Sequence, residues 1–313
     1  RCKLDLYLPA EGKDFPTVVW FHGGGLTGGS SALTLFSDAH VREQDVVLVG
    51  VNHRLNVFGY TYLGGLSPKY AIGNVGQLDL IAALEWVKRN IANFGGDPNN
   101  VTIFGESGGG AKISALLAMP GAQGLFHKAA VQSGSVLKAG DPETATAAAR
   151  KLMANLGLTD VNDLQQVPTD KLFAASRTMG QPAVIVDGAS LPHQTWDPKA
   201  PELSATIPLI IGCNKDESSL SYTKDEATHA LTDAALKERI MAAGIPAADQ
   251  IISLYRRDHP NESPTDIWFR ITTDRGTRRN SIRQAERKAE QNQAKVFFYY
   301  CQWDTPLAEG THK

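Results

Sequence analysis

The feature that most constrains this chain is a serine among glycines at the junction between a predicted strand and a predicted helix. The run G-E-S-G-G-G occupies residues 105–110, after a β-branched run at 101–104 and before a helical pattern of small apolar residues at 109–119. A strand that turns directly into a helix strains the residue at the turn, and glycines two positions to either side relieve the crowding. The serine hydroxyl is then exposed at the sheet's carboxyl edge, beside a helix N-terminus that suits a developing oxyanion. The motif predicts that Ser107 is a catalytic nucleophile.

Short apolar runs alternate with longer helical patterns along the remainder of the chain. The runs that predict strands are residues 4–8, 17–21, 46–51, 101–104, 129–132, 208–212 and 296–300. Those after the first are continuous, which is typical of strands buried on both faces. Residues 77–93 carry apolar side chains at i, i+3, i+4 and i+7, which predicts an amphipathic helix. This alternation predicts an α/β fold with a mostly parallel sheet and helices on both faces.

Two stretches, residues 141–201 and 222–294, depart from the alternation and predict helical excursions. The helices expected within them include 145–156, 169–179 and an Arg-rich helix over 275–288. Acidic residues interleave the Arg-rich stretch, which indicates a solvated helix face. We therefore expect one α/β domain over residues 1–313, incomplete at both ends, that contains both excursions.

A second glycine-rich turn follows the strand predicted at 17–21. His22 is followed by Gly23, Gly24 and Gly25. In a hydrolase with a serine elbow, such a loop donates backbone N–H groups to the carbonyl oxygen of the substrate as that oxygen becomes negative. The N–H groups of Gly24 and Gly25, together with that of Gly108, are expected to form an oxyanion hole of three donors.

The same loop also fits a dinucleotide-binding pattern, G-x-G-x-x-G, through Gly23, Gly25 and Gly28. That pattern needs a helix that begins at once and an acidic residue at the end of the next strand. Residues 28–31 are a poor helix start, and the next strand is followed by N-H-R at 52–54. A nucleotide cofactor is therefore not expected.

The other members of a catalytic triad are expected after the serine, in the chain order nucleophile, acid, histidine. Asp216 and Glu217 follow the strand predicted at 208–212. Position alone leaves both open as the acid, or as acidic residues that begin a helix. His312 is the only histidine after the last predicted strand, so the base is His312 or a residue beyond Lys313. The other histidines are expected to be surface or supporting residues.

Composition excludes several classes of protein. The 31 Lys and Arg against 33 Asp and Glu give a formal charge of −2, which does not attract the chain to nucleic acid or to an anionic membrane. The apolar runs fall far short of the roughly 18 residues that a membrane helix needs. Cys2, Cys213 and Cys301 show no metal-ligand spacing and no disulfide framework. We expect no metal, and the compartment and the oligomeric state stay open.

These motifs together resemble the type-B carboxylesterase and cholinesterase family, especially its bacterial para-nitrobenzyl-esterase-like members. The resemblance covers most of the chain and is most specific between residues 74 and 107. It rests on VVWFHGGG at 18–25, VNHRL at 51–55, GNVGQLD at 73–79, NFGGDP at 93–98, FGES at 104–107, QSG at 132–134 and NKDE at 214–217. The resemblance implies an α/β-hydrolase fold and a serine carboxylesterase that acts on small-molecule carboxylic esters without a cofactor.

The resemblance also assigns roles to residues. Ser107 matches the family nucleophile, Glu217 rather than Asp216 matches its acid, and three glycines match its oxyanion donors: Gly24, Gly25 and Gly108. The two helical excursions are expected to wall the acyl and alcohol pockets. The side chains expected to line them are Leu26, Phe58, Tyr60 and Tyr62.

Two departures from the family pattern concern the site. The family usually has alanine where Gly108 stands, although the backbone N–H is retained. The family histidine lies in a pattern like K-A-F-H, which places it about three residues past Lys313 and favours a truncated chain over His312 as the base. The alternative to an esterase is a non-catalytic protein that uses the same fold for binding or adhesion.

Overall fold

A seven-stranded sheet is the framework of the part of the chain that the computed structural model describes, residues 3–33 and 38–304. The strand order is β1-β3-β2-β4-β5-β6-β7. The strands are β1 (Lys3–Tyr7), β2 (Phe15–Phe21), β3 (Val47–Asn52), β4 (Gly96–Glu106), β5 (Lys128–Gln132), β6 (Leu209–Asn214) and β7 (Val296–Cys301). β2 pairs in parallel with β3 and β4, and β4 with β5, whereas β1 runs antiparallel to β3. The predicted mostly parallel sheet is confirmed.

The chain divides into two compact units, each described here by itself. The first comprises Arg1–Ile211 and Gln284–Phe297, and the second comprises Gly212–Arg283 and Phe298–Lys313. Several short 3₁₀ segments occur: Ser31–Leu33, Pro68–Tyr70, Ile91–Phe94, Pro120–Ala122, Val161–Gln166, Glu202–Ser204 and Glu217–Tyr222; Asp274–Arg278 is a π-helix.

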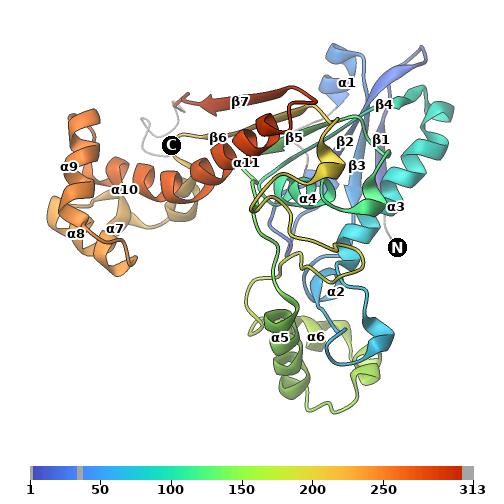
Figure 1. Ribbon diagram of the computed structural model, residues 1–313, viewed down its shortest axis with the longest axis horizontal. Coiled ribbons are helices and arrows are strands. Elements are labelled where there is room, and N and C mark those ends of the chain that lie inside the picture. Colours follow the sequence, from blue (N-terminus) through green and yellow to red (C-terminus); the bar gives the residue numbers. More distant parts are fainter. Residues whose placement is uncertain (1–2, 34–37, 305–313) are drawn as a thin grey trace. The chain divides into compact units, whose positions relative to one another are not determined.

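Helices cover both faces of the sheet in the first unit. Side chains alternate across a strand, so Val19 and Phe21 of β2 face one core while Trp20 faces the other. α3 (Val75–Asn90) and α4 (Gly108–Leu116) pack on the first face (Figure 1). α1 (Asp38–Gln44) covers the second face through Val41. This arrangement confirms the predicted layers and leaves the loops at the strand ends to carry polar groups.

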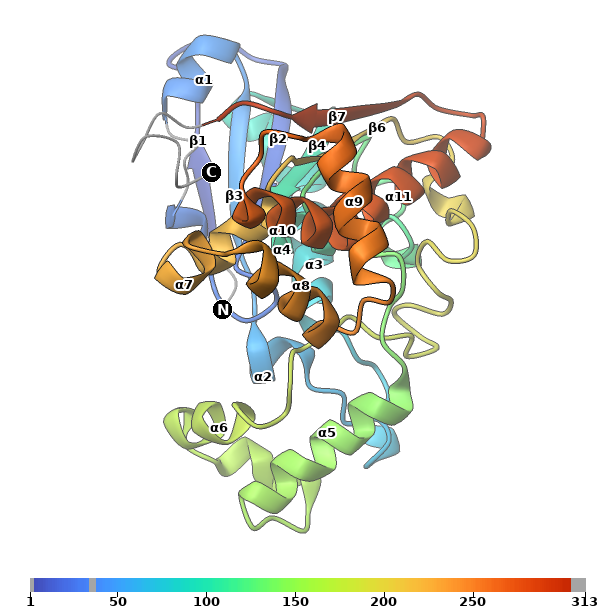
Figure 2. The same cartoon turned by 90° about the vertical axis from the view of Figure 1, so that its left-hand side faces the viewer.

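The first helical excursion lies in the first unit, away from strands β1 to β5 (Figures 1 and 2). It contains α5 (Pro142–Asn155) and α6 (Thr169–Ser176), close to the predicted helices, and it packs with α2 (Asn56–Tyr60) around a small core of its own. The segment around Ile185 is held against the start of α3 by Asn74, the N-cap residue of that helix. The Asn74 amide donates to the Ile185 carbonyl at 2.9 Å and accepts from the Ile185 N–H at 2.9 Å.

The second unit contains most of the second excursion. Its helices are α7 (Glu226–His229), α8 (Asp233–Ala242), α9 (Ala248–Asp258) and α10 (Pro264–Thr273), and α11 (Arg279–Glu290) continues from it into the first unit. α10 begins with a capping box in which Ser263 and Asp266 satisfy each other's backbone N–H groups. Leu236, Ile240 and Ile267 are buried between α8 and α10. The unit therefore has a core of its own.

One expectation about burial is wrong, and a second holds only in part. β7 was expected to be buried on both faces, but Phe297 is 56% exposed and Phe298 42% exposed, because β7 stands at one edge of the sheet. The Arg-rich stretch was expected to be a solvated face. Its arginines at 275, 279 and 283 are exposed, but Lys288 is buried and Arg287 half-buried. Their head groups bind the Ser204 carbonyl at 2.6 Å and the Asp197 carboxylate at 2.5 Å, which satisfies their charges inside the protein.

The packing of β4 predicts a large cost for truncation at Ile103, which is fully buried in the main core. Ile103→Ala should lower the free energy of unfolding by about 2–5 kcal/mol, through lost apolar burial and the cavity left behind. Urea denaturation followed by circular dichroism measures this. Ile72→Ala is the matched control, since Ile72 is 60% exposed and should cost roughly 0.5 kcal/mol or less. Equal costs for the two variants would contradict the assigned core.

Candidate active site

The register of three parallel strands brings two functional loops to the same edge of the sheet. Phe21 at the end of β2 lies beside Gly105 of β4, and Glu106 lies beside Gln132 at the end of β5. The glycine loop after β2 and the serine turn after β4 therefore leave the sheet as neighbours at its carboxyl edge, where α/β proteins place their ligand sites.

Ser107 stands at a strained turn between β4 and α4. Its backbone has φ 53° and ψ −117°, a conformation that L-residues rarely adopt. The turn is held on both sides, because the Ser107 N–H donates to the Gln132 carbonyl at 2.8 Å and the Ser107 carbonyl accepts from the Ala111 N–H at 3.0 Å. The residue is half-buried and occupies the N-cap position of α4, where its side chain makes no capping hydrogen bond. These features are those of the predicted nucleophile turn.

The glycines around Ser107 are required by close backbone contacts. A Cβ at Gly109 would lie 2.0 Å from the Phe21 carbonyl oxygen, and a Cβ at Gly105 would lie 2.7 Å from the same atom. No side chain fits at such distances, so α4 approaches β2 only because both positions are glycine. The sequence argument for these two glycines is confirmed.

The glycine loop meets the serine turn directly. Gly24 and Gly25 have φ of 88° and 64°, and the Gly28 N–H closes a turn by donating to the Gly24 carbonyl at 3.1 Å. A Cβ at Gly108 would lie 2.5 Å from the Gly25 nitrogen and 2.2 Å from its oxygen. Glycine at position 108 thus leaves room for the loop. The type-B carboxylesterase family, which the sequence resembles, usually has alanine at this position. The structure brings Gly25 and Gly108 together, as an oxyanion hole requires.

The nucleotide alternative for this loop does not fit the structure. After Gly25 the chain makes turns, and its next helical segments are the 3₁₀ turn Ser31–Leu33 and then α1, so no helix begins at Gly28. A dinucleotide fingerprint places the pyrophosphate on a helix N-terminus at this point.

The buried His22 and Lys112 and the half-buried His53 lie beside the glycine loop. The His22 ring lies 5.0 Å from that of His53, and the His22 Nδ1 is 2.8 Å from the Gly23 carbonyl oxygen. Burial, and then the nearby Lys112, lower the pKa of His22 to about 4 and that of His53 to about 3. Both rings are therefore neutral at pH 7. The motifs in the sequence assign no role to Lys112, although a lysine in a helix of small apolar residues is an informative signal.

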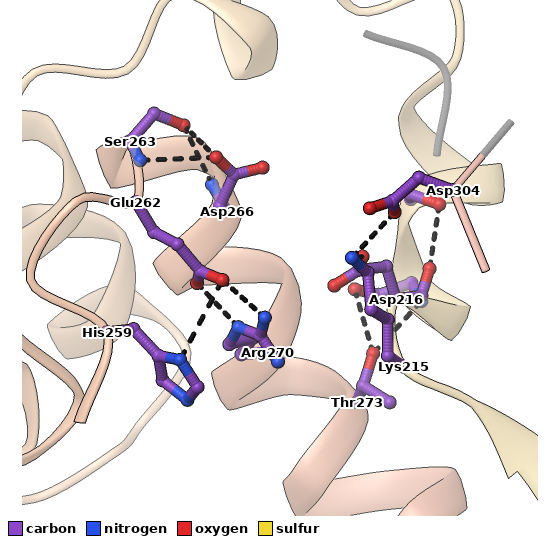
Figure 3. A network of polar contacts seen from close by, with 11 residues as sticks. Lys215, Asp216, His259, Glu262, Ser263, Asp266, Arg270, Thr273 and Asp304 are labelled. Carbon is purple, nitrogen blue, oxygen red and sulfur yellow. Dashed lines mark hydrogen bonds and ion pairs between the residues drawn. The ribbon is translucent and has the colours of Figure 1, made fainter. Parts of the chain in front are cut away.

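The two candidate acids lie in the second unit and have different surroundings. Asp216 is buried beside Lys215, whose Nζ is 3.8 Å from the Asp216 carboxylate and 2.6 Å from that of Asp304 (Figure 3). Glu217 is half-buried and its carboxylate accepts the Asn214 N–H at 2.7 Å. A carboxylate beside a lysine is a poor partner for an imidazole, which favours Glu217 as the acid.

His312 lies outside the described residues. Two of the described histidines are engaged in backbone contacts: His127 Nδ1 accepts the Val101 N–H at 3.1 Å, and His229 Nε2 is 2.9 Å from the Tyr222 carbonyl oxygen. These contacts fit the expected supporting roles.

A cavity of about 130 Å³ lies between α2 and the first helical excursion. Tyr60 and Tyr62, both expected to line a pocket, are among its walls, together with Asp141 of the excursion. Within residues 3–33 and 38–304, no cluster of His, Cys, Asp or Glu could hold a metal ion. No helix in those ranges is both long enough and apolar enough to cross a membrane.

Comparison with known proteins gives consistent matches. A model of the "Carboxylesterase family" matches residues 2–311. The para-nitrobenzyl esterase of Bacillus subtilis (strain 168) is 36% identical over 276 residues, which cover 82% of this chain and 55% of the relative. The human cocaine esterase is 38% identical over 224 residues, which cover 68% and 39%. The chain thus spans about half the length of the curated relatives it matches.

Solved structures agree with these relatives. The carboxylesterase EST55 of Geobacillus stearothermophilus superposes with a TM-score of 0.83 at 35% identity, over 98% of this chain and 66% of that one. A PNB esterase gives a TM-score of 0.80 at 31% identity, over 97% and 66%.

The close approach of α4 to β2 predicts that Gly109→Ala is damaging. The added Cβ meets a backbone oxygen that cannot move alone, so the variant should lose about 1–3 kcal/mol of stability. Thermal unfolding measures the loss. Gly28→Ala is the matched control, because a Cβ there would meet no atom within 4 Å. A Gly109→Ala variant as stable as Gly28→Ala would refute this packing.

Proposed function

Because this chain belongs to the carboxylesterase family, we propose that the protein containing it is a serine carboxylesterase that uses Ser107 as its nucleophile. The fold is that of the α/β-hydrolase carboxylesterases. The observation that carries the proposal is the contact between the Gly25 and Gly108 backbones beside the strained turn at Ser107. It supports an oxyanion hole next to a nucleophile, which is the minimum that acyl transfer requires.

In this proposal the Ser107 hydroxyl attacks the ester carbonyl carbon and transfers its proton to a histidine. The carbonyl oxygen becomes an oxyanion, which the N–H groups of Gly24, Gly25 and Gly108 stabilise. The protonated histidine then donates its proton to the departing alcohol, which leaves an acyl-enzyme. A water molecule, deprotonated by the same histidine, releases the carboxylic acid and restores Ser107.

The histidine in this mechanism is neither His22 nor His53. Burial lowers the pKa of these two rings to about 4 and about 3, so they are weak bases at neutral pH. Glu217 accepts the N–H of the catalytic imidazole and holds its tautomer. At neutral pH these two rings add no charge beside the glycine loop.

We propose carboxylic esters as the substrate class. The name of the Bacillus relative refers to para-nitrobenzyl esters and that of the human relative to cocaine, which are both carboxylic esters.

Replacing the nucleophile tests the proposal. Ser107→Ala in the full-length protein should lower the turnover of p-nitrophenyl acetate by about 10⁶-fold and abolish labelling by a fluorophosphonate. Ser253→Ala, on the exposed face of α9, is the control and should keep full activity. Retained labelling in Ser107→Ala would remove Ser107 as the nucleophile.

The two acids are separated by a pair of isosteric variants. Glu217→Gln should lower kcat by about 10⁴-fold, because the amide no longer holds the correct imidazole tautomer. Asp216→Asn should mainly lower thermal stability, because it leaves the half-buried Lys215 without one of its two carboxylate partners. Steady-state kinetics and thermal unfolding of both variants give the comparison. The assignment fails if Asp216→Asn is the variant that loses catalysis.

A further inference from the structure

Lys112 is a fully buried lysine on the helix that begins at the nucleophile. Its Nζ donates a hydrogen bond to the His22 carbonyl oxygen at 2.8 Å, and that carbonyl belongs to the peptide that opens the glycine loop. The helix α4 thus reaches the loop twice, at its start through Gly108 against Gly25 and one turn later through Lys112.

Pairing with an opposite charge does not explain why Lys112 is buried. In the described part of the chain no salt bridge reaches Lys112. The carboxylate that acts on neighbouring His53 is Asp79, and Asp79 forms a two-point ion pair with Arg54, at 2.8 Å to Nε and 2.7 Å to Nη2. Burial lowers the pKa of the Lys112 amine to about 7. Burying an amine that makes only one hydrogen bond to a carbonyl is unfavourable for folding. The buried Lys112 is therefore expected to contribute to function rather than to stability.

A glycine loop needs an external anchor. Gly23, Gly24 and Gly25 have no side chains to pack, and glycine backbones are the most mobile in an unrestrained loop. The loop is internally bent by the Gly28 to Gly24 hydrogen bond, but that bond does not fix it relative to Ser107. Lys112 can fix it, because Ser107 is the N-cap residue of the helix that carries Lys112.

We propose that Lys112 is a positioning residue that ties the glycine loop to the nucleophile helix and so sets the distance from the oxyanion donors to Ser107. This inference rests on the proposed function. It assigns to Lys112 no contact with substrate: the amine acts through the His22 peptide. A displacement of the oxyanion donors by about 1 Å lowers turnover by about 100-fold. The catalytic gain from the Lys112 hydrogen bond therefore outweighs the stability lost by burying the amine.

A second buried lysine in the same unit supplies a matched control. Lys288 on α11 is as buried as Lys112, and its Nζ donates to the carbonyl oxygens of Ser204 and Ala205 and to the Gln291 side chain, at 2.6, 2.8 and 3.0 Å. None of these acceptors belongs to the glycine loop. Lys288 therefore has a structural role that can be compared with the role proposed for Lys112.

The test compares Lys112→Met with Lys288→Met in the full-length protein, using p-nitrophenyl acetate. Lys112→Met should lower kcat by about 10- to 100-fold, with KM changed less than about threefold and the midpoint of thermal unfolding unchanged or raised. The rate of fluorophosphonate labelling should fall in parallel. Lys288→Met should lower the unfolding midpoint and keep kcat.

The inference is overturned if Lys112→Met keeps the wild-type kcat, or if both variants lose stability and activity together. Should Lys112→Met not fold, Lys112→Leu takes its place under the same criteria. Ser107→Ala separates this inference from the proposed function. An inactive Ser107→Ala beside a fully active Lys112→Met rejects only the role of Lys112, whereas an active Ser107→Ala rejects the proposed function itself.

Discussion

The parallel pairing of β2 with β4 is the interaction on which the candidate site depends. Hydrogen bonds of this ladder set Phe21 beside Gly105, and the two segments that continue from these residues become the glycine loop and the turn at Ser107. A shift by one residue would turn every side chain of β2 to the opposite face and separate the loops. The buried alternation of Val19, Trp20 and Phe21 between two cores makes such a shift costly, so the core fixes the geometry of the site.

Local chemistry explains what could be predicted from the sequence. The turn around Ser107 was predictable because its strained backbone admits only glycine at 105 and 109. The strands were predictable because short, continuous apolar runs are typical of strands buried on both faces. The choice of Glu217 over Asp216 came from a resemblance, since adjacent acids look equivalent until the lysine beside one of them is known. The exposure of β7 and the role of Lys112 depend on neighbours distant in sequence, which periodicity does not report.

The electrostatics behind the glycine loop are unusual for a region so rich in titratable groups. His22 and His53 are neutral at pH 7, and Asp79 is neutralised by Arg54. A region of low polarity with little net charge strengthens each remaining dipole, including the peptide N–H groups of the loop. The amine of Lys112, with a pKa lowered to about 7, is the group there whose charge changes near neutrality.

The contact between Gly108 and Gly25 has a consequence for how this sequence can vary. Any side chain at position 108 collides with the main chain at position 25, so the two positions constrain each other although they lie far apart along the chain. In this chain, a side chain at position 108 therefore requires a shift of the main chain around Gly25. Diversification of position 108 by directed evolution should therefore also vary the loop around Gly25, because a change at 108 alone meets a steric barrier that a shifted loop removes.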